Sequence, residues 1–140
     1  MTETAGYAGA LSRKLDIGPG DAVALIGAPW WLEDALAAVP GVIELHTDLD
    51  GAEMFDVIVV FVEQRAELEA ELGRLRERMA PACGLWIAWP KRASRVPTDM
   101  TDNVVRQIAL PTGLVDNKVC AIDETWSGLR LVIRKENRPR

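Results

Sequence analysis

The stretch from Phe55 to Glu63 carries a continuous hydrophobic pattern. Every residue from Val57 to Val62 is β-branched or aromatic, and a single carboxylate closes the run. An apolar run of strand length without alternation is typical of a strand buried on both faces, with parallel neighbours and helices on either side. We therefore predict a central strand here, around which the rest of the chain is arranged.

Helical and strand-like patterns alternate on both sides of this run. Helical spacing of apolar residues predicts helices over residues 7–15, from Trp30 or Trp31 to residue 39, and over residues 65–79. A further helix follows a cap at Asp99 or Thr101 and turns residues 104, 105 and 108 inward. The other predicted strands cover residues 22–26, 42–46, 85–89, 118–122 and 129–134.

This alternation predicts an α/β fold with three layers, in which helices cover both faces of a Rossmann-like sheet of about six, mostly parallel strands. The last two strands are joined by a turn over residues 123–128, so they form a C-terminal antiparallel hairpin. With 140 residues and 49% hydrophobic composition, the chain is expected to be a single domain, 1–140. Within it, residues 1–20 are assigned to an N-terminal helix and turn and residues 135–140 to a frayed basic tail.

The net charge of −5 bears on the class of partner. Nucleic-acid binding rests first on phosphate neutralisation, so an acidic domain makes that class unlikely. The sequence has no apolar run long enough for a membrane span and no signal-peptide layout, and we expect a cytoplasmic protein with no membrane contact. Cys83 and Cys120 have no C-x-x-C spacing, which argues against a disulfide or a metal site.

The order of elements from about residue 20 to about residue 135 resembles the latter half of the class I S-adenosylmethionine-dependent methyltransferases. The segments that carry this resemblance are Phe55–Val60, Leu75–Pro90 and Gly113–Lys118. It implies that the strands starting at residues 42, 22, 55, 85, 129 and 118 lie side by side in that order, with the family's third strand missing. A second resemblance, carried by Trp89–Ser94 and Val115–Leu129, is to an uncharacterised family of small bacterial proteins defined as a domain of unknown function.

The turn after the first strand departs from the methyltransferase pattern. That family usually has three glycines there, whereas this chain has Gly27 followed by Ala28 and Pro29. Proline lacks a backbone N–H, and Trp30 with Trp31 takes up space that the methionine half of the cofactor needs. The resemblance makes S-adenosylmethionine a possible cofactor, this turn disfavours it, and the sequence indicates no other.

Ligands in open α/β sheets bind beyond the carboxyl ends of the parallel strands. The expected ligand-binding residues at those ends are Gly27, Trp30, Asp48, Glu63, Trp89, Lys91, Arg92, Asp123 and Trp126. Asp99 and Thr101 join them because residues 98–103 hold more capping side chains than one helix start needs.

Two interpretations of this crevice stay open. It is either an aromatic-walled pocket, with Lys91 or Arg92 for an anion and Asp123 or Glu63 for a donor, or a crevice plugged by tryptophans. In both, Trp30, Trp89 and Trp126 are expected to form one cluster.

No segment pairs a nucleophile with a base, so the sequence predicts no catalytic residue. Our main hypothesis is a non-catalytic ligand-sensing or protein-interaction module, whose partner is an unidentified small ligand or protein. The alternative is a small S-adenosylmethionine-dependent methyltransferase, because methyl transfer depends on orientation more than on acid or base groups. The sequence does not indicate an oligomeric state.

Overall fold

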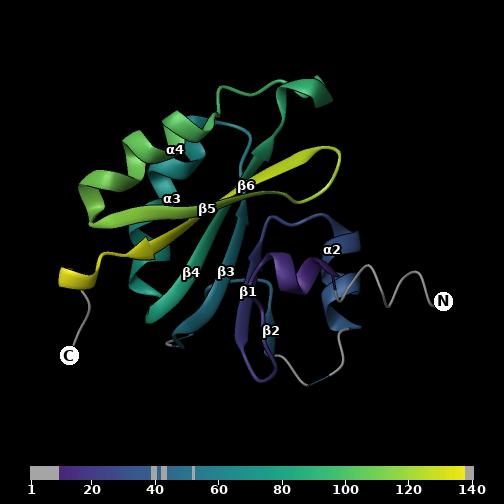
Figure 1. Ribbon diagram of the computed structural model, residues 1–140, viewed down its shortest axis with the longest axis vertical. Helices are drawn as coiled ribbons and strands as arrows, with labels where there is room; N and C mark the ends of the chain where they lie inside the picture. The colour runs from purple at the N-terminus through teal and green to yellow at the C-terminus, as the bar shows by residue number, and fades with distance from the viewer. Residues whose placement is uncertain (1–9, 39–40, 42–43, 52, 138–140) are drawn as a thin grey trace.

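The computed structural model describes residues 10–38, 41, 44–51 and 53–137. These residues form a six-stranded sheet with the order β2-β1-β3-β4-β6-β5 (Figure 1). The strands are β1 (Ala22–Ile26), β2 (Glu44–His46), β3 (Phe55–Phe61), β4 (Met79–Pro90), β5 (Leu114–Ala121) and β6 (Trp126–Ile133). β1 pairs in parallel with β2 and β3, and β3 with β4, whereas β6 is antiparallel to both β4 and β5. The predicted fold class, strand order and hairpin are confirmed.

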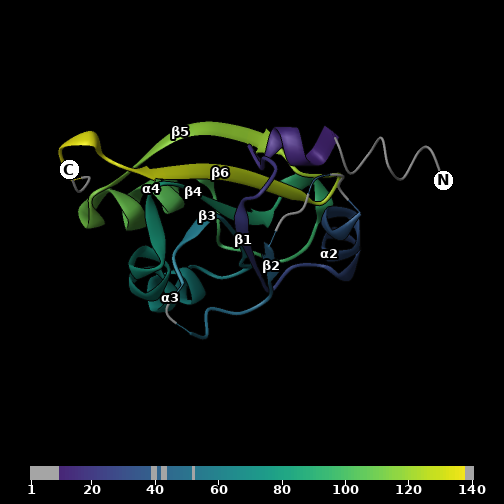
Figure 2. The same ribbon diagram turned by 90° about the horizontal axis from the view of Figure 1, so that it is seen from below.

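Helices pack on both faces of the sheet (Figure 2). The α-helices are α2 (Trp30–Ala37), α3 (Arg65–Glu77) and α4 (Asp102–Ala109), and residues 10–14 are also helical. Short 3-10 turns follow at η1 (Arg92–Ser94), η2 (Leu110–Thr112) and η3 (Lys135–Asn137). α3 and α4 share one apolar cluster with the sheet, and α2 and the N-terminal helical residues share the other. No helix in the described ranges is both long and apolar enough to cross a membrane.

β3 is the central strand that the apolar run predicts. Ile58 and Val60 join the cluster on the α3–α4 side, while Val57, Val59 and Phe61 join the cluster on the α2 side. Ile58 and Val59 are both 0% exposed, because each face of the strand is covered by a helical layer.

The boundary between α3 and β4 differs from the prediction. The helix ends at Glu77, and β4 already begins at Met79, where the sequence pattern predicts helix to residue 79 and strand only from residue 85. Met79 is buried in the strand as it would be in the helix, so the apolar spacing does not separate the two. Pro81 lies where the β3–β4 register shifts, and β6 pairs with β4 only from Leu85 onward. A proline at this irregular position removes no ladder hydrogen bond, so the strand tolerates it.

The terminal hairpin is longer than predicted, and residues 135–137 of the basic tail form a 3-10 turn. β5 starts at Leu114 and β6 at Trp126, which shortens the turn to residues 122–125. β5 is an edge strand with polar side chains at residues 116–118, and such a polar run hides a strand from pattern analysis. Residues 135–137 form η3, and the Asn137 N–H donates to the Arg134 carbonyl at 2.9 Å. The predicted helix residues 7–9 and 39, strand residues 42 and 43, and tail residues 138–140 lie outside the described residues.

Candidate functional site

A pocket of about 670 Å³ lies beyond the carboxyl ends of β1 and β3. The chain leaves β1 toward β2 on one side and returns to β3 on the other, so the strand order reverses at this point. Ligands in open α/β sheets bind at such switch points. We call the hollow lined by residues 27–29, 31, 61, 63, 67, 123, 125 and 126 the switch-point pocket.

Aromatic rings form one wall of the switch-point pocket. The Phe61 and Trp126 rings meet edge to face, with centroids 4.9 Å apart and planes at 84°. Trp31 and Trp126 are half-buried and pack on the same apolar cluster as Phe61. Each ring therefore packs on the core on one side and borders the pocket on the other.

Among the described residues, three carboxylates and no lysine or arginine line the pocket. Glu67 belongs to the capping box of α3, where its Oε1 accepts from the Gln64 N–H at 2.9 Å. Asp123 Oδ1 accepts from the N–H groups of Thr125 and Trp126 at 2.8 and 2.7 Å. The exposed Glu63 bonds within the described residues only through its backbone, so its carboxylate is available to a ligand. Aromatic faces beside carboxylates suit a cationic group that carries an apolar body.

The turn after β1 brings bare backbone to this pocket. Gly27 has φ +67°, and a Cβ there would lie 3.2 Å from the Phe61 carbonyl oxygen. A side chain is therefore strained at this position for both conformational and steric reasons. Trp30, at the start of α2, is 77% exposed and does not line the pocket, so it does not fill the space as the sequence suggests.

A second hollow, of about 570 Å³, lies on the α3–α4 side of the sheet. It is lined by residues 89, 90, 92, 95–102, 119 and 127, and we call it the arginine pocket. The expected site residues Trp89, Arg92, Asp99 and Thr101 lie here, whereas Gly27, Glu63, Asp123 and Trp126 line the switch-point pocket. The predicted crevice is thus divided between two faces.

The predicted cluster of Trp30, Trp89 and Trp126 is wrong. In the β4–β6 ladder Trp89 pairs with Ser127 and Pro90 pairs with Trp126. Residues directly opposite each other share a face and successive residues alternate, so the two tryptophans point to opposite faces. Trp89 accordingly packs in the α3–α4 cluster and Trp126 against the α2 cluster.

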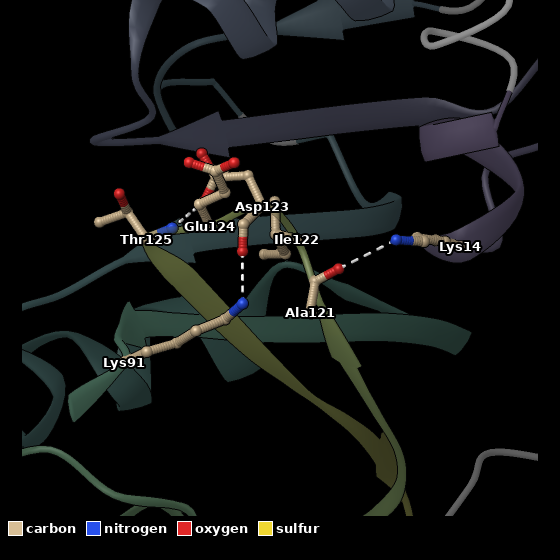
Figure 3. Close-up of a pocket in the computed structure, with 7 residues that line it drawn as sticks. All are labelled: Lys14, Lys91, Ala121, Ile122, Asp123, Glu124 and Thr125. Carbon is tan, nitrogen blue, oxygen red and sulfur yellow. Dashed lines mark hydrogen bonds between the residues drawn. The ribbon is translucent and has the colours of Figure 1, made fainter. Parts of the chain in front are cut away.

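Lys91 and Asp48 line neither of these pockets. Lys91 Nζ donates to the Asp123 carbonyl at 2.5 Å, and Lys14 Nζ donates to the Ala121 carbonyl at 3.2 Å. The two lysines approach the β5–β6 turn from different sides and line a separate hollow of about 560 Å³ (Figure 3). Asp48 Oδ1 accepts from the Asp50 N–H at 3.0 Å, which makes a local turn after β2.

The surplus of capping residues at 98–103 serves two helices. Thr101 is the N-cap of α4, and its Oγ1 accepts from the Val104 N–H at 3.2 Å. Asp99 Oδ1 instead accepts from the Arg65 N–H at 2.6 Å, in the first turn of α3. Thr98 Oγ1 donates to the Glu63 carbonyl, so this loop is tied to the start of α3. Their capping and tethering roles account for Asp99 and Thr101 without a ligand.

Sequence reasoning missed Phe61 and Glu67 as pocket residues. Phe61 is the last residue of β3. Residues two apart in a strand lie on the same face, so Phe61 could have been predicted on the α2 face together with Val57 and Val59. The spacing of Gln64 and Glu67 is that of a capping box, which would have placed a carboxylate at the start of α3.

The cysteines do not form a reactive site. Burial, aided by the charge of Asp56, raises the pKa of the Cys83 thiol from 9.0 to about 12. Burial also raises the pKa of Cys120. In the described part of the chain, no three His, Cys, Asp or Glu side chains gather to hold a metal ion.

We therefore expect Cys83 to resist a chromogenic disulfide reagent at about pH 8, since only the thiolate reacts. Because the native state holds this proton to higher pH than the unfolded chain, the thiol's contribution to stability is complete below pH 9.0 and is lost as pH rises toward about 12. Absorbance measured with and without denaturant tests this, with Cys83→Ser to assign the protected thiol. Fast reaction of both thiols in the native protein would contradict the burial of Cys83.

The fold is similar to those of solved methyltransferases and of a fibrillarin. Mitomycin 7-O-methyltransferase matches with a TM-score of 0.69 at 14% identity, over 94% of this chain and 54% of that one. Magnesium protoporphyrin IX methyltransferase from Synechocystis PCC 6803 with bound SAM matches with a TM-score of 0.64 at 11% identity, over 94% and 79%. Fibrillarin from Aeropyrum pernix, with natively bound S-adenosyl-L-methionine, matches with a TM-score of 0.62 at 13% identity, over 92% and 76%.

At such identities the likeness shows the fold alone. No protein-family model and no curated protein matches the sequence. The methyltransferase-like fold is confirmed, and the resemblance to the small bacterial family gains no support.

Proposed function

We propose that the protein binds S-adenosylmethionine in the switch-point pocket and acts as a small methyltransferase. The observation that carries the proposal is the pocket's place at the switch point, where it combines aromatic rings and carboxylates without a basic side chain. Two similar folds hold this cofactor in their solved structures, which supports the assignment.

The residues present fit a sulfonium compound. Trp31, Phe61 and Trp126 line the pocket, and a cation over the face of an aromatic ring is attracted to it, more strongly where water is excluded. The Glu63 carboxylate is available for a positive group of the ligand, and the bare backbone at Gly27 permits close approach. When bound, the cofactor supplies an activated methyl group. The protein's own contribution is to bind, orient and exclude water, which is the main requirement of methyl transfer.

The turn after β1 favours a second candidate function, that of a non-catalytic ligand-sensing module. Pro29 is the N-cap of α2 and offers no N–H or side-chain cap at the point where the backbone meets the pocket. Of the three carboxylates in the pocket, Glu67 and Asp123 are engaged by backbone N–H groups. These features are compatible with binding, and they leave the Glu63 carboxylate as the one open to a ligand among the described residues of the pocket.

We expect S-adenosylmethionine to raise the melting temperature by several degrees. A ligand at a hundred times its dissociation constant adds about 2.7 kcal/mol, and about 1 kcal/mol shifts a domain of this size by a few degrees. S-adenosylhomocysteine, which lacks the sulfonium charge, should give a smaller shift. Trp126→Ala should abolish the shift, whereas Trp30→Ala should preserve it because Trp30 is 77% exposed and outside the pocket.

Differential scanning fluorimetry with both ligands measures these shifts. The absence of any shift in the wild-type protein would exclude cofactor binding. A shift without transfer of a labelled methyl group to any acceptor in a cell extract would favour the sensing module.

A further inference from the structure

The arginine pocket contains two cationic side chains that have no partner in the described part of the chain. Arg92 and Arg95 both line it and are exposed, and neither guanidinium makes a hydrogen bond or ion pair within the described residues. Arg65, Arg74 and Arg106, by contrast, each contact a carboxylate at 3.1–3.5 Å. The pair in the pocket is therefore available to an external anion.

The turn that carries both arginines is held by its own hydrogen bonds. Ser94 Oγ donates to the Lys91 carbonyl at 2.6 Å, and the Arg95 N–H donates to the Arg92 carbonyl at 3.1 Å. Arg95 has φ +62°, a left-handed conformation that costs a residue other than glycine about 1 kcal/mol or more. Arg95 thus occupies a position where glycine would be less strained. Because the backbone of the turn is already fixed, binding of an anion costs the rotamer freedom of the two side chains but no ordering of the turn.

The carboxylates that line the same pocket are already engaged. Asp99 Oδ1 accepts from the Arg65 N–H at 2.6 Å. Asp102 Oδ2 accepts from Arg106 Nη1 at 3.1 Å. Neither carboxylate contacts Arg92 or Arg95 in the described part of the chain, so the donors of both guanidinium groups remain open to an external anion.

Apolar side chains form the floor of the arginine pocket. Trp89 is 7% exposed and Met100 is 3% exposed, and both belong to the α3–α4 cluster. Val119, on the neighbouring edge strand, is 64% exposed and adds an apolar surface beside them. A volume of about 570 Å³ lies in the range of small-molecule sites.

We propose that the arginine pocket binds a small organic anion. Arg92 and Arg95 hold its carboxylate or phosphate group, because guanidinium groups match the planar or bidentate geometry of such oxyanions. Its apolar part lies against Trp89, Met100 and Val119. This site is on the other face of the sheet from the switch-point pocket, so it stands whether or not that pocket binds a cofactor.

Phenyl phosphate, phenylacetate and inorganic phosphate are suitable probes. In titrations of the ¹⁵N-labelled protein followed by NMR, phenyl phosphate or phenylacetate should give saturable shifts in the amides of residues 119 and 127 and of the non-proline residues in the range 89–102. Either should bind more tightly than inorganic phosphate, which cannot use the floor. The double change Arg92→Gln and Arg95→Gln should weaken binding by about tenfold or more, as loss of charge-assisted hydrogen bonds does.

Arg13→Gln is the matched control, since Arg13 is also exposed and lies outside the arginine pocket. It should leave the dissociation constants unchanged. Tighter binding of phenyl phosphate than of phenylacetate would assign a phosphorylated ligand, and the reverse a carboxylate. Equal weakening by Arg13→Gln, or no saturable binding of any probe at millimolar concentration, would overturn the proposal.

Discussion

Val59→Asp is expected to leave no cooperatively folded protein. Val59 is 0% exposed, lies in the middle of β3, and pairs with Leu25 on β1 and Trp86 on β4. A carboxyl group at this point loses its hydration and gains no partner, which costs several kcal/mol in addition to the lost apolar burial. Domains of this kind have a total stability of about 5–15 kcal/mol, so the substitution removes most or all of it.

Circular dichroism during thermal melting measures this effect. Val119→Asp is the matched control, because it places the same side chain on an edge-strand valine that is 64% exposed. Its free energy of unfolding should stay within about 0.5 kcal/mol of the wild-type value. A soluble Val59→Asp protein with a sharp melting transition would mean that β3 is not the core of the sheet.

Trp86→Ala is expected to lower the free energy of unfolding by about 4–8 kcal/mol. Trp86 is 0% exposed and contacts the α2-side cluster together with Leu11 and Leu15. Removal of a buried tryptophan costs about 3–5 kcal/mol, because the cavity does not close completely. Its Nε1 donates to the Leu15 carbonyl at 3.0 Å, and the buried carbonyl left behind adds about 1–3 kcal/mol.

Urea denaturation curves of Trp86→Ala and Trp86→Phe separate the contribution of packing from that of the hydrogen bond. Trp86→Phe keeps most of the ring volume and loses the donor, so it should cost less than Trp86→Ala. Trp30→Ala should change stability by about 0.5 kcal/mol or less, since Trp30 is 77% exposed. If Trp86→Ala and Trp30→Ala were equally stable, the packing of the segment around Leu11 and Leu15 would not depend on Trp86.

The candidate site was only partly predictable from the sequence. The resemblance and the rule for ligand sites in open α/β sheets predict at which end of the sheet the site lies. One pocket there is lined by Gly27, Glu63, Asp123 and Trp126. The sequence did not indicate that Trp89 and Arg92 belong to a different pocket. That division depends on which residues of β4 and β6 face each other, and residues so far apart in the chain reveal no pairing by themselves.

The sequence by itself determined the layers and the central strand. A run of β-branched and aromatic residues from Val57 to Val62 is typical of a strand buried on both faces, and apolar spacing marks the faces of α2, α3 and α4 that pack on the sheet. The tertiary structure alone decided where β4 begins, because Met79 is buried in either conformation and only its pairing with Phe55 makes it a strand residue. It also decided that Asp99 serves α3 and that Trp89 and Trp126 lie on opposite faces, since both depend on contacts between distant segments and on strand register.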